Sequence, residues 1–308
     1  MKKITIVGGG NVGASTAQLC AYKELGDIVL MDRIEGLPQG KSLDILESAP
    51  LEGFDVNIMG SNDYADAANS DVVVITAGKP RTPGMTRADL IHVNSEIVKS
   101  VTEQIVKVSP NAFFIIASNP LDTMCYVAKK VGGLKRNRIV GMSGVLDSAR
   151  MRTFIALELN VAPEDVQAMV LGSHGEDMVP LPRCSTVSGI PITDLMTKEQ
   201  IERITQRTID GGKEIVSLLK SGSAYYSPAS AIVQMVESVV KNKERVMPCS
   251  VYLEGEYGIE GTFTGVPAKL GENGLEGIIE FPLHDDEHRA LVSSANRVKE
   301  AIKELDIF

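Results

Sequence analysis

Short apolar runs that alternate with helical patterns constrain the fold of this chain more than any other feature. Residues 4–7 form a short β-branched run, and the centres of 27–32, 71–77 and 112–118 are apolar without interruption. Strands of this kind, in contrast to alternating ones, suit a parallel sheet that is covered on both faces. Helical patterns such as 88–108 lie between them and supply the cover. The sequence therefore predicts a doubly wound α/β sheet made of βα units with short connections.

A different texture begins at Ser143. The expected elements there are a helix over 147–159, an apolar strand that ends before His174, a hairpin within 180–192, helices over 198–219 and 228–241, strands near 246–252, 261–263 and 277–280, and a final helix from Asp285. Helices and short strands in this order are typical of an α+β domain. We therefore expect a first domain at 1–142 and a second, α+β domain at 143–308.

The bulk composition indicates a globular protein with a small-molecule function. Of the 308 residues, 44% are hydrophobic and 23% are charged, which is ordinary for a globular chain of two domains. The net charge of −9 argues against nucleic acid or an anionic membrane as the main partner. No apolar run approaches the ~20 residues of a membrane span, and MKKITIVGGG lacks the long apolar segment of a secretory signal. We expect a cytoplasmic protein without nucleic-acid or membrane partners.

The four cysteines predict neither a metal site nor a disulfide framework. Cys20, Cys125, Cys184 and Cys249 lie far apart, with no CxxC pair and no histidine at ligand spacing. This arrangement favours buried free thiols. We expect no bound metal.

A glycine-rich turn follows the first strand and opens the first helix. Its six residues are Gly8, Gly9, Gly10, Asn11, Val12 and Gly13, which fit the pattern G-x-G-x-x-G. Glycines at these positions allow a tight turn, a close approach of the backbone to a pyrophosphate, and close packing of the helix on the strand. The phosphates would lie at the helix N-terminus, where free N–H groups and the helix dipole favour negative charge.

Asp32 ends the second expected strand, 19 residues after Gly13. A carboxylate at this place accepts hydrogen bonds from an adenosine ribose, so the βαβ unit predicts a Rossmann site for a dinucleotide. Asp32 also repels a 2′-phosphate, which favours NAD over NADP, although the neighbouring Arg33 weakens this preference. The alternative is a turn that merely packs the helix. A P-loop is excluded because no Gly-Lys-Ser or Gly-Lys-Thr follows the turn.

A nicotinamide enzyme needs a side chain that exchanges a proton with the substrate oxygen. Tyr126 and Lys130 have the Tyr-x-x-x-Lys spacing of short-chain dehydrogenases, but the glycine spacing differs from theirs, and we expect Tyr126 to pack. Ligands for a zinc-dependent enzyme are missing. His174, in LGSHGED at the end of an apolar strand, is the better candidate. The other histidines are expected to have surface or packing roles: His92, His284 and His288.

Asp147 and Arg150 strengthen the assignment of His174. They stand three residues apart in LDSAR, which places both on one face of a helix. Taken alone, the two would be an ordinary helical ion pair.

Five motifs in order resemble the lactate/malate dehydrogenase family: GGGNVG, AGKPRTPGMTR, SNPLD, LDSARMR and GSHGE. The resemblance covers essentially the whole chain and is strongest to the malate dehydrogenases of lactate-dehydrogenase type. It implies NAD-dependent oxidation of (S)-malate to oxaloacetate, a reaction of the tricarboxylic acid cycle. It also implies a homo-oligomer. Tetramers are common in this branch and dimers are known, and no residue decides between them.

The roles of the family's site residues carry over to the matching positions. The resemblance makes His174 the proton donor and acceptor, with Asp147 as its orienting partner. Arg150 is implied to bind the C1 carboxylate of the substrate, for which a flat guanidinium is the matching group. Arg87 would polarise the reacting carbonyl, and Asn119 would bond the substrate oxygen. The residues implied to line the cofactor beyond the glycine turn are Asn94, Ala117, Ser118 and Asn119.

Arg81 is implied to meet the far end of the substrate. Oxaloacetate would pair its charge, whereas pyruvate would leave a guanidinium buried and unpaired, which costs about 3–5 kcal/mol. The implied preference for oxaloacetate is roughly 10² to 10³. Lactate enzymes of the family carry a neutral Gln here. Pro80, Pro83 and Gly84 are expected to shape a hinge that brings the loop into the site.

Glu176 stands where many relatives have Asp, a departure that should not affect the chemistry. Two other functions stay open. One is a lactate dehydrogenase or a broader 2-hydroxyacid dehydrogenase. The other is a non-catalytic NAD sensor that kept the fold.

Overall fold

The computed structural model describes residues 1–79 and 86–305, and its first half contains a parallel sheet. The strands are β1 (Lys3–Val7), β2 (Asp27–Met31), β3 (Ile58–Ser61), β4 (Val72–Ile75), β5 (Phe113–Ile116) and β6 (Ile139–Gly141). They lie in the order β3-β2-β1-β4-β5-β6 and are all parallel. From β1 the chain adds strands first on one side, as β2 and β3, and then on the other side, as β4, β5 and β6. In sheets of this kind ligands bind outside the carboxyl ends of the strands, at the point between β1 and β4 where the order reverses.

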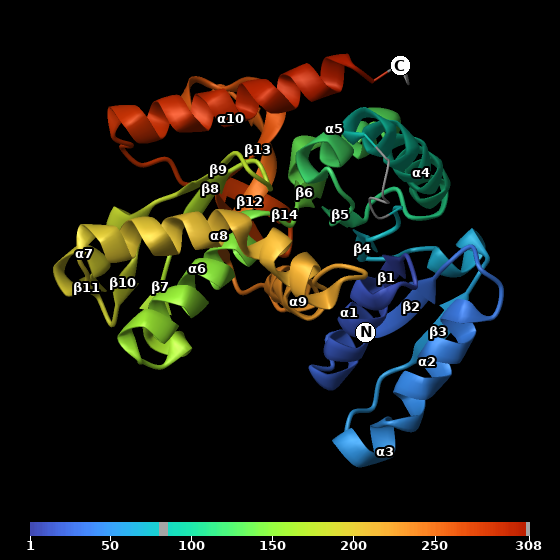
Figure 1. The fold of residues 1–308 in the computed structure, drawn as a ribbon. Helices are drawn as coiled ribbons and strands as arrows, with labels where there is room; N and C mark the ends of the chain where they lie inside the picture. Colours follow the sequence, from blue (N-terminus) through green and yellow to red (C-terminus); the bar gives the residue numbers. More distant parts are fainter. Residues whose placement is uncertain (80–85, 306–308) are drawn as a thin grey trace.

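Helices cover both faces of this sheet. They are α1 (Asn11–Tyr22), α2 (Leu37–Glu47), α3 (Ala49–Glu52), α4 (Arg87–Val108) and α5 (Leu121–Val131). Figure 1 shows α4 and α5 side by side, with α1 elsewhere beside the later helix α9 (Tyr226–Val240). Within β4, Val72 and Val74 belong to the cluster on the α1 side, and Val73 and Ile75 belong to the cluster with α4 and α5. Burial on both faces explains why the strand is apolar throughout, and the predicted doubly wound sheet is confirmed.

The second half is α+β, as expected. Its remaining elements are α6 (Gly144–Leu159), β7 (Val166–Gln167), β8 (Val170–Gly172), β9 (Met178–Pro180), β10 (Thr186–Val187), β11 (Ile190–Pro191), α7 (Ile192–Leu195), α8 (Lys198–Leu219), β12 (Arg245–Glu254), β13 (Glu260–Gly271), β14 (Gly274–Ile278) and α10 (Asp285–Lys303). The predicted hairpin is the antiparallel pair β10 and β11. The strand expected at 261–263 is far longer, because β13 pairs with β12 along nearly its whole length.

The two halves share one sheet. β12 pairs antiparallel with β6, and β13 and β8 follow, so that a single row of partners crosses four strands. This row is Gly141, Ser250, Gly265 and Gly172. A Cβ on Gly265 would stand 2.5 Å from the carbonyl oxygen of Gly172, so only glycine allows this close crossing. The row brings the end of β8, and with it His174, to the carboxyl end of β6.

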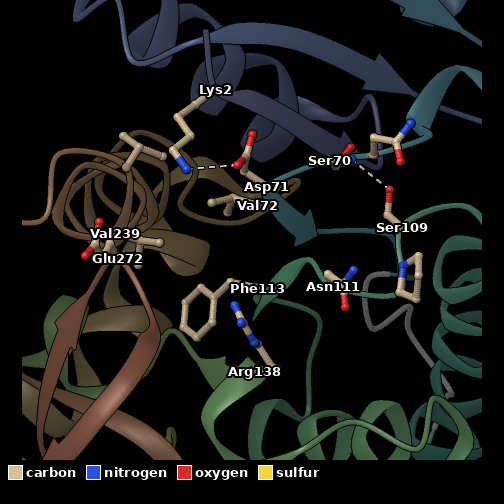
Figure 2. A pocket seen from close by; sticks show the side chains of 13 residues that line it. Lys2, Ser70, Asp71, Val72, Ser109, Asn111, Phe113, Arg138, Val239 and Glu272 are labelled. Atoms are coloured by element: carbon tan, nitrogen blue, oxygen red, sulfur yellow. Dashed lines mark hydrogen bonds and ion pairs between the residues drawn. The ribbon is translucent and has the colours of Figure 1, made fainter.

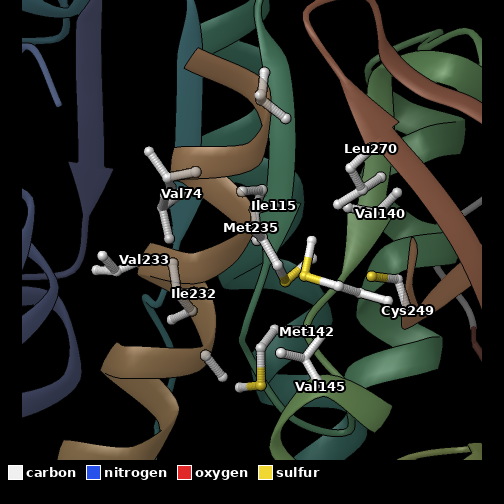
Figure 3. Close-up of a cluster of buried hydrophobic side chains, with 14 of the residues drawn as sticks. Val74, Ile115, Val140, Met142, Val145, Ile232, Val233, Met235, Cys249 and Leu270 are labelled. Atoms are coloured by element: carbon white, nitrogen blue, oxygen red, sulfur yellow. The ribbon is translucent and has the colours of Figure 1, made fainter. Parts of the chain in front are cut away.

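The core is also shared. Figure 3 shows the cluster in which α9 meets both halves of the sheet. Met235 of α9 belongs to one buried cluster with Val74 and Val140 of the parallel strands and with Cys249 and Leu270 of β12 and β13. Burial of such side chains stabilises the folded chain by about 1.5–3 kcal/mol each. Nothing in the described ranges forms a helix both long and apolar enough to cross a bilayer.

Candidate active site

The glycine-rich turn lies at the switch point, between β1 and α1. A Cβ on Gly13 would stand 1.8 Å from the carbonyl oxygen of Gly8, so the helix packs on the strand at a distance that only glycine permits. Gly8 itself has φ +116°, in the region that favours glycine. A Cβ on Gly10 would meet nothing within 4 Å. α1 begins at Asn11 after Gly10 without a side-chain cap, so its first N–H groups are left to bind a ligand such as a pyrophosphate.

Asp32 follows β2 and lies against this turn. Its Oδ2 accepts a hydrogen bond from the Gly9 backbone N–H at 2.7 Å, and its Oδ1 accepts one from the Ile34 N–H at 3.0 Å. The carboxylate is therefore fixed at the end of β2, beside the open side of the turn. This is where the sequence predicts a ribose-binding acid.

Asn94 of α4 joins two further segments predicted to line the cofactor. Its Oδ1 accepts from the Lys79 N–H at 2.7 Å, and its Nδ2 donates to the carbonyl oxygen of Asn119 at 2.7 Å. The Ser118 hydroxyl donates to the Ala77 carbonyl oxygen at 2.6 Å. These bonds hold the segments after β4 and β5 together at the carboxyl edge of the sheet. The side chain of Asn119 is exposed there, while Ala117 and Ser118 are less accessible.

His174, Asp147 and Arg150 come together, although 27 residues separate His174 from Asp147 in the chain. The Nδ1 of His174 lies 2.9 Å from Oδ2 of Asp147, and Nη1 of Arg150 lies 3.3 Å from the other carboxylate oxygen. Asp147 is 2% exposed, so its charge is almost wholly shared between these two partners. Burial lowers the pKa of His174, but the Asp147 carboxylate outweighs it, and the pKa is raised above its ordinary value.

The guanidinium of Arg150 has a hydrogen-bond donor that is not satisfied by the described residues. Its Nε is buried and has no hydrogen-bond partner among the residues that the structure describes. Its side chain lies against Gly211 and Gly212 in the middle of α8, where a Cβ on Gly211 would stand 3.1 Å from Cδ of Arg150. A buried, unpaired donor on a cation fits an anionic ligand such as a carboxylate. The glycine pair leaves the room that the arginine occupies.

Asp122 is a site residue that the sequence reasoning did not single out. It lies in the first turn of α5 and is 4% exposed. Its Oδ2 accepts the His174 backbone N–H at 2.9 Å, and its Oδ1 accepts the hydroxyl of Ser250. Burial raises the pKa of Asp122 to about 6, against the lowering effect of these hydrogen bonds. The SNPLD motif contains Asp122, but an acid in a first helical turn is common, and only the fold reveals its contact with His174.

The side chains of the two loop arginines, Arg81 and Arg87, lie outside the part of the chain that the structure describes. Arg81, with Pro80, Pro83 and Gly84, lies outside the described residues. Arg87 begins α4, and its side chain is outside the described part as well. Glu176, the departure from the family pattern, is exposed and pairs with Lys213 of α8 at 2.7 Å.

The residues expected to be bystanders have structural roles. Tyr126 packs against the cluster between α4, α5 and the sheet, as expected. His92 is exposed, His284 caps α10, and His288 bonds the carbonyl oxygen of Tyr257. The thiols are free, and three are buried as predicted: Cys20, Cys125 and Cys249. Cys184 is only partly buried, which the spacing of the cysteines could not reveal. Over residues 1–79 and 86–305, no group of three or more His, Cys, Asp or Glu could hold a metal ion.

A cavity of about 330 Å³ lies at the opposite, amino-terminal edge of the parallel strands. Figure 2 shows its lining, with Arg138 and Phe113 on one side and Lys2 with Asp71 on the other. Lys2 and Asp71 bind each other at 3.0 Å, so their charges are already paired. None of the predicted site residues lines this cavity. The site lies at the other edge of the sheet.

Comparison with known proteins gives two family matches. Residues 2–141 match the model of the lactate/malate dehydrogenase NAD-binding domain, and residues 144–308 match the model of the lactate/malate dehydrogenase alpha/beta C-terminal domain. A malate dehydrogenase of Roseiflexus sp. (strain RS-1) is 54% identical over 303 residues, which are 98% of each chain.

Solved structures agree with these matches. The malate dehydrogenase of Cryptosporidium parvum has a TM-score of 0.97 at 44% identity, over 100% of this chain and 99% of that one. The lactate dehydrogenase of Cryptosporidium parvum, complexed with lactic acid and nicotinamide adenine dinucleotide, has a TM-score of 0.96 at 43% identity, over 100% and 98%. The backbone is therefore similar to that of enzymes with either name, and side chains must distinguish the substrates.

Proposed function

Because the chain belongs to the lactate/malate dehydrogenase family, we infer that it catalyses the NAD-dependent oxidation of (S)-malate to oxaloacetate and the reverse reduction. Relatives named malate dehydrogenase cover nearly the full chain at 50–54% identity. The substrate is accordingly a small dicarboxylate. We propose further that His174, Asp147 and Arg150 are the residues that act on it.

One observation carries this site assignment, namely the shared carboxylate of Asp147. It holds His174 at 2.9 Å and Arg150 at 3.3 Å, while the buried Nε of Arg150 has no partner among the described residues. A substrate carboxylate would satisfy this guanidinium and add a second, well-oriented contact. Because Arg150 and His174 share Asp147, the carbon next to that carboxylate would lie within reach of the imidazole.

His174 transfers the proton in this proposal. Asp147 binds Nδ1, which leaves Nε2 for the substrate oxygen. In malate oxidation the neutral ring accepts the hydroxyl proton at Nε2, and in oxaloacetate reduction the charged ring returns it. The raised pKa of His174 favours the charged form, which is the proton donor.

The carboxyl edge of the sheet would hold the cofactor. When bound, NAD⁺ supplies the acceptor for the hydride that leaves C2 of malate. The open face of Gly10 and the uncapped start of α1 fit its pyrophosphate, and Asp32 fits the adenosine ribose. The other proposed cofactor contacts are Gly8, Gly9, Asn11, Val12, Gly13, Asn94, Ala117, Ser118 and Asn119.

Arg81 and Arg87 complete the proposal from the sequence motif alone. Arg87 directs positive charge at the carbonyl oxygen, where negative charge develops, and such a donor contributes about 3–4 kcal/mol in other enzymes. Arg81 pairs with the second carboxylate and thereby selects oxaloacetate over pyruvate. Asn119 bonds the substrate oxygen from the other side.

Assembly, domain division and cellular location remain proposals as well. We expect a homotetramer, with a dimer as the alternative. Leu43 and Leu46 of α2 and Leu51 of α3 are 56%, 42% and 86% exposed, and exposed apolar groups of this kind are typical of interfaces. The division at 142/143 is supported by the separate family matches. The free thiols favour a reducing compartment, in keeping with a cytoplasmic enzyme of the tricarboxylic acid cycle.

A substrate panel tests the function. The loss of NADH absorbance is followed with oxaloacetate, with pyruvate and with a larger 2-oxoacid, and NADPH replaces NADH in a parallel series. We expect oxaloacetate to exceed pyruvate in kcat/KM by roughly 10² or more. Comparable rates with pyruvate would indicate a broader 2-hydroxyacid dehydrogenase. Tight NADH binding without turnover of any acid would indicate a sensor.

A further inference from the structure

A second buried carboxylate lies on the backbone side of His174. Asp122 of α5 accepts the His174 N–H at 2.9 Å and the hydroxyl of Ser250, which belongs to β12. Asp122 therefore ties the start of α5 to β12 and to the segment that follows β8, both of which are distant in the sequence. The same turn follows Asn119, so one carboxylate connects both segments that are proposed to contact the substrate oxygen.

We propose that Asp122 is a positioning residue for His174, which fixes the backbone of the histidine and whose negative charge favours the protonated imidazole. The inference rests on the proposed role of His174 as the proton carrier. Asp122 does not reach the substrate in this scheme. It acts through His174 alone.

Charge balance in the site supports the proposal. Asp147 faces two cations, because it binds both Arg150 and, when protonated, His174. One carboxylate cannot neutralise two positive charges in a buried place, where an uncompensated charge is strongly unfavourable. Asp122 supplies the second negative charge, so that two anions balance two cations when His174 carries its proton. The attraction of Asp122 raises the pKa of His174, whereas Arg150 opposes it.

Two buried thiols also lie near Asp122. Burial raises the pKa of the Cys125 and Cys249 thiols, so both are neutral near pH 7. α10 contributes the Ser294 hydroxyl, which accepts the Ser173 N–H at 2.8 Å, and Arg297, whose charge is paired with Asp177. Nothing about backbone positioning requires a charge, since an asparagine oxygen would accept the His174 N–H equally well. A carboxylate kept at 4% exposure, against its desolvation, indicates that the charge itself has a function.

The experiment measures the His174 titration directly, in the unliganded protein. The protein is labelled with ¹³C-histidine, the four ring signals are followed by NMR against pH, and His174 is assigned by its absence in His174→Asn. Asp122→Asn should lower the pKa of His174 relative to the wild type. Ser250→Ala, which removes one donor to the carboxylate and so favours its protonation, should lower it less.

Asp71→Asn is the matched control. Asp71 also accepts a backbone N–H from another strand, Lys3 at 2.8 Å, but it lies at the opposite edge of the sheet. The control should leave the His174 titration where it is. In steady-state assays, Asp122→Asn should lower kcat/KM for oxaloacetate at pH 8 about three- to tenfold, because less of the His174 ring is then protonated than in the wild type. The loss should be smaller at pH 6.

An unchanged His174 titration in both Asp122→Asn and Ser250→Ala would overturn the proposal, provided that the variants keep the wild-type circular dichroism. If Asp122→Asn does not fold, the His174 titration in Ser250→Ala decides the question. The result is independent of the proposed enzyme activity, since the NMR titration needs neither NADH nor substrate. A shifted titration without malate turnover would therefore refute the function and keep the coupling.

Discussion

Gly211 of α8 lies directly against Arg150 of α6: a Cβ on Gly211 would stand 3.1 Å from Cδ of the arginine. Gly212 follows it, and a glycine in the middle of a helix costs about 1 kcal/mol relative to alanine. α8 nevertheless has two adjacent glycines where it contacts the Arg150 side chain. The two glycines thus leave room for Arg150, the arginine proposed to bind the substrate.

Gly211→Ala should therefore weaken substrate binding without unfolding the helix. The new methyl forces Arg150 to shift by a few tenths of an ångström, so we expect KM for oxaloacetate to rise about three- to tenfold with a smaller change in kcat. Gly212→Ala is the matched control, because its Cβ would lie 3.7 Å from the guanidinium, at ordinary contact distance. Steady-state kinetics of both variants provide the test. An equal rise in KM for Gly211→Ala and Gly212→Ala would refute this account.

The glycine turn should separate into a packing residue and a binding residue. Gly13→Ala places a Cβ 1.8 Å from the Gly8 carbonyl oxygen, so it should lower the melting temperature and disturb α1. Gly10→Ala meets nothing within 4 Å and should keep the melting temperature, yet weaken NADH binding at least about tenfold by filling the space for the phosphates. Thermal melts and NADH fluorescence titrations measure the two effects. Unimpaired NADH binding by Gly10→Ala would contradict the assignment of that space.

The buried carboxyl of Asp122 should make the folded chain less stable as the pH rises, which is the reverse of the usual effect of an aspartate. Its pKa of about 6 lies above that of an unfolded aspartate near 4, so the native chain holds a proton that the unfolded chain has lost between these values. This contribution to the free energy of unfolding is present below about pH 4 and is lost as the pH rises through about 6.

Asp122→Asn removes this loss. Between pH 4.5 and 6.5 the variant should gain stability relative to the wild type, by up to about 2–3 kcal/mol. Asp71 has the opposite linkage, because its pKa is lowered: burial raises it, but the bonds from Lys3 and Lys2 outweigh burial. Its contribution to stability is present above about pH 4 and is lost at lower pH, so the destabilisation caused by Asp71→Asn should be constant between pH 4.5 and 6.5 and should shrink below about pH 4. Thermal melts from about pH 3 to 6.5 check both signs, and a pH-independent difference for Asp122→Asn would contradict the account.

Arg81→Gln should change the substrate. Without the guanidinium, oxaloacetate loses the partner of its second carboxylate and pyruvate no longer leaves a buried charge unpaired. We expect kcat/KM for oxaloacetate to fall by roughly 10² or more, with activity on pyruvate gained or unharmed. Arg33→Gln, a change of the same kind beside Asp32, is the control and should leave the ratio of the two acids unaltered. Wild-type oxaloacetate reduction by Arg81→Gln would remove Arg81 as the selector.

Local patterns predicted the parallel half of the fold well. Strands such as β4 are buried on both faces, so Val72 to Ile75 are apolar without a break, and the turn at Gly8 to Gly13 marks the first βα unit. The extent of β13 was not predictable from its own residues. It depends on pairing with β12 and on the glycine row through Gly265, which are contacts between distant segments.

The site divides in the same way. His174, Asp147 and Arg150 were predicted by motif, and the fold brings them within hydrogen-bond distance. Asp122 was missed because its contact with His174 spans 52 residues, and its helical position has an ordinary explanation. Two adjacent glycines inside the long helical pattern at 198–219 were the available signal for the packing of Arg150. A glycine within a helix often marks such a close approach.

The central claim is that His174 transfers the proton in malate oxidation, and His174→Asn tests it most directly. Stopped-flow reduction of oxaloacetate by the variant is compared with its NADH affinity, measured by fluorescence. We predict a fall in turnover of about 10²- to 10⁴-fold with NADH affinity unchanged, because the ring does not belong to the turn proposed to bind the cofactor. Turnover within a few-fold of the wild type would contradict the claim.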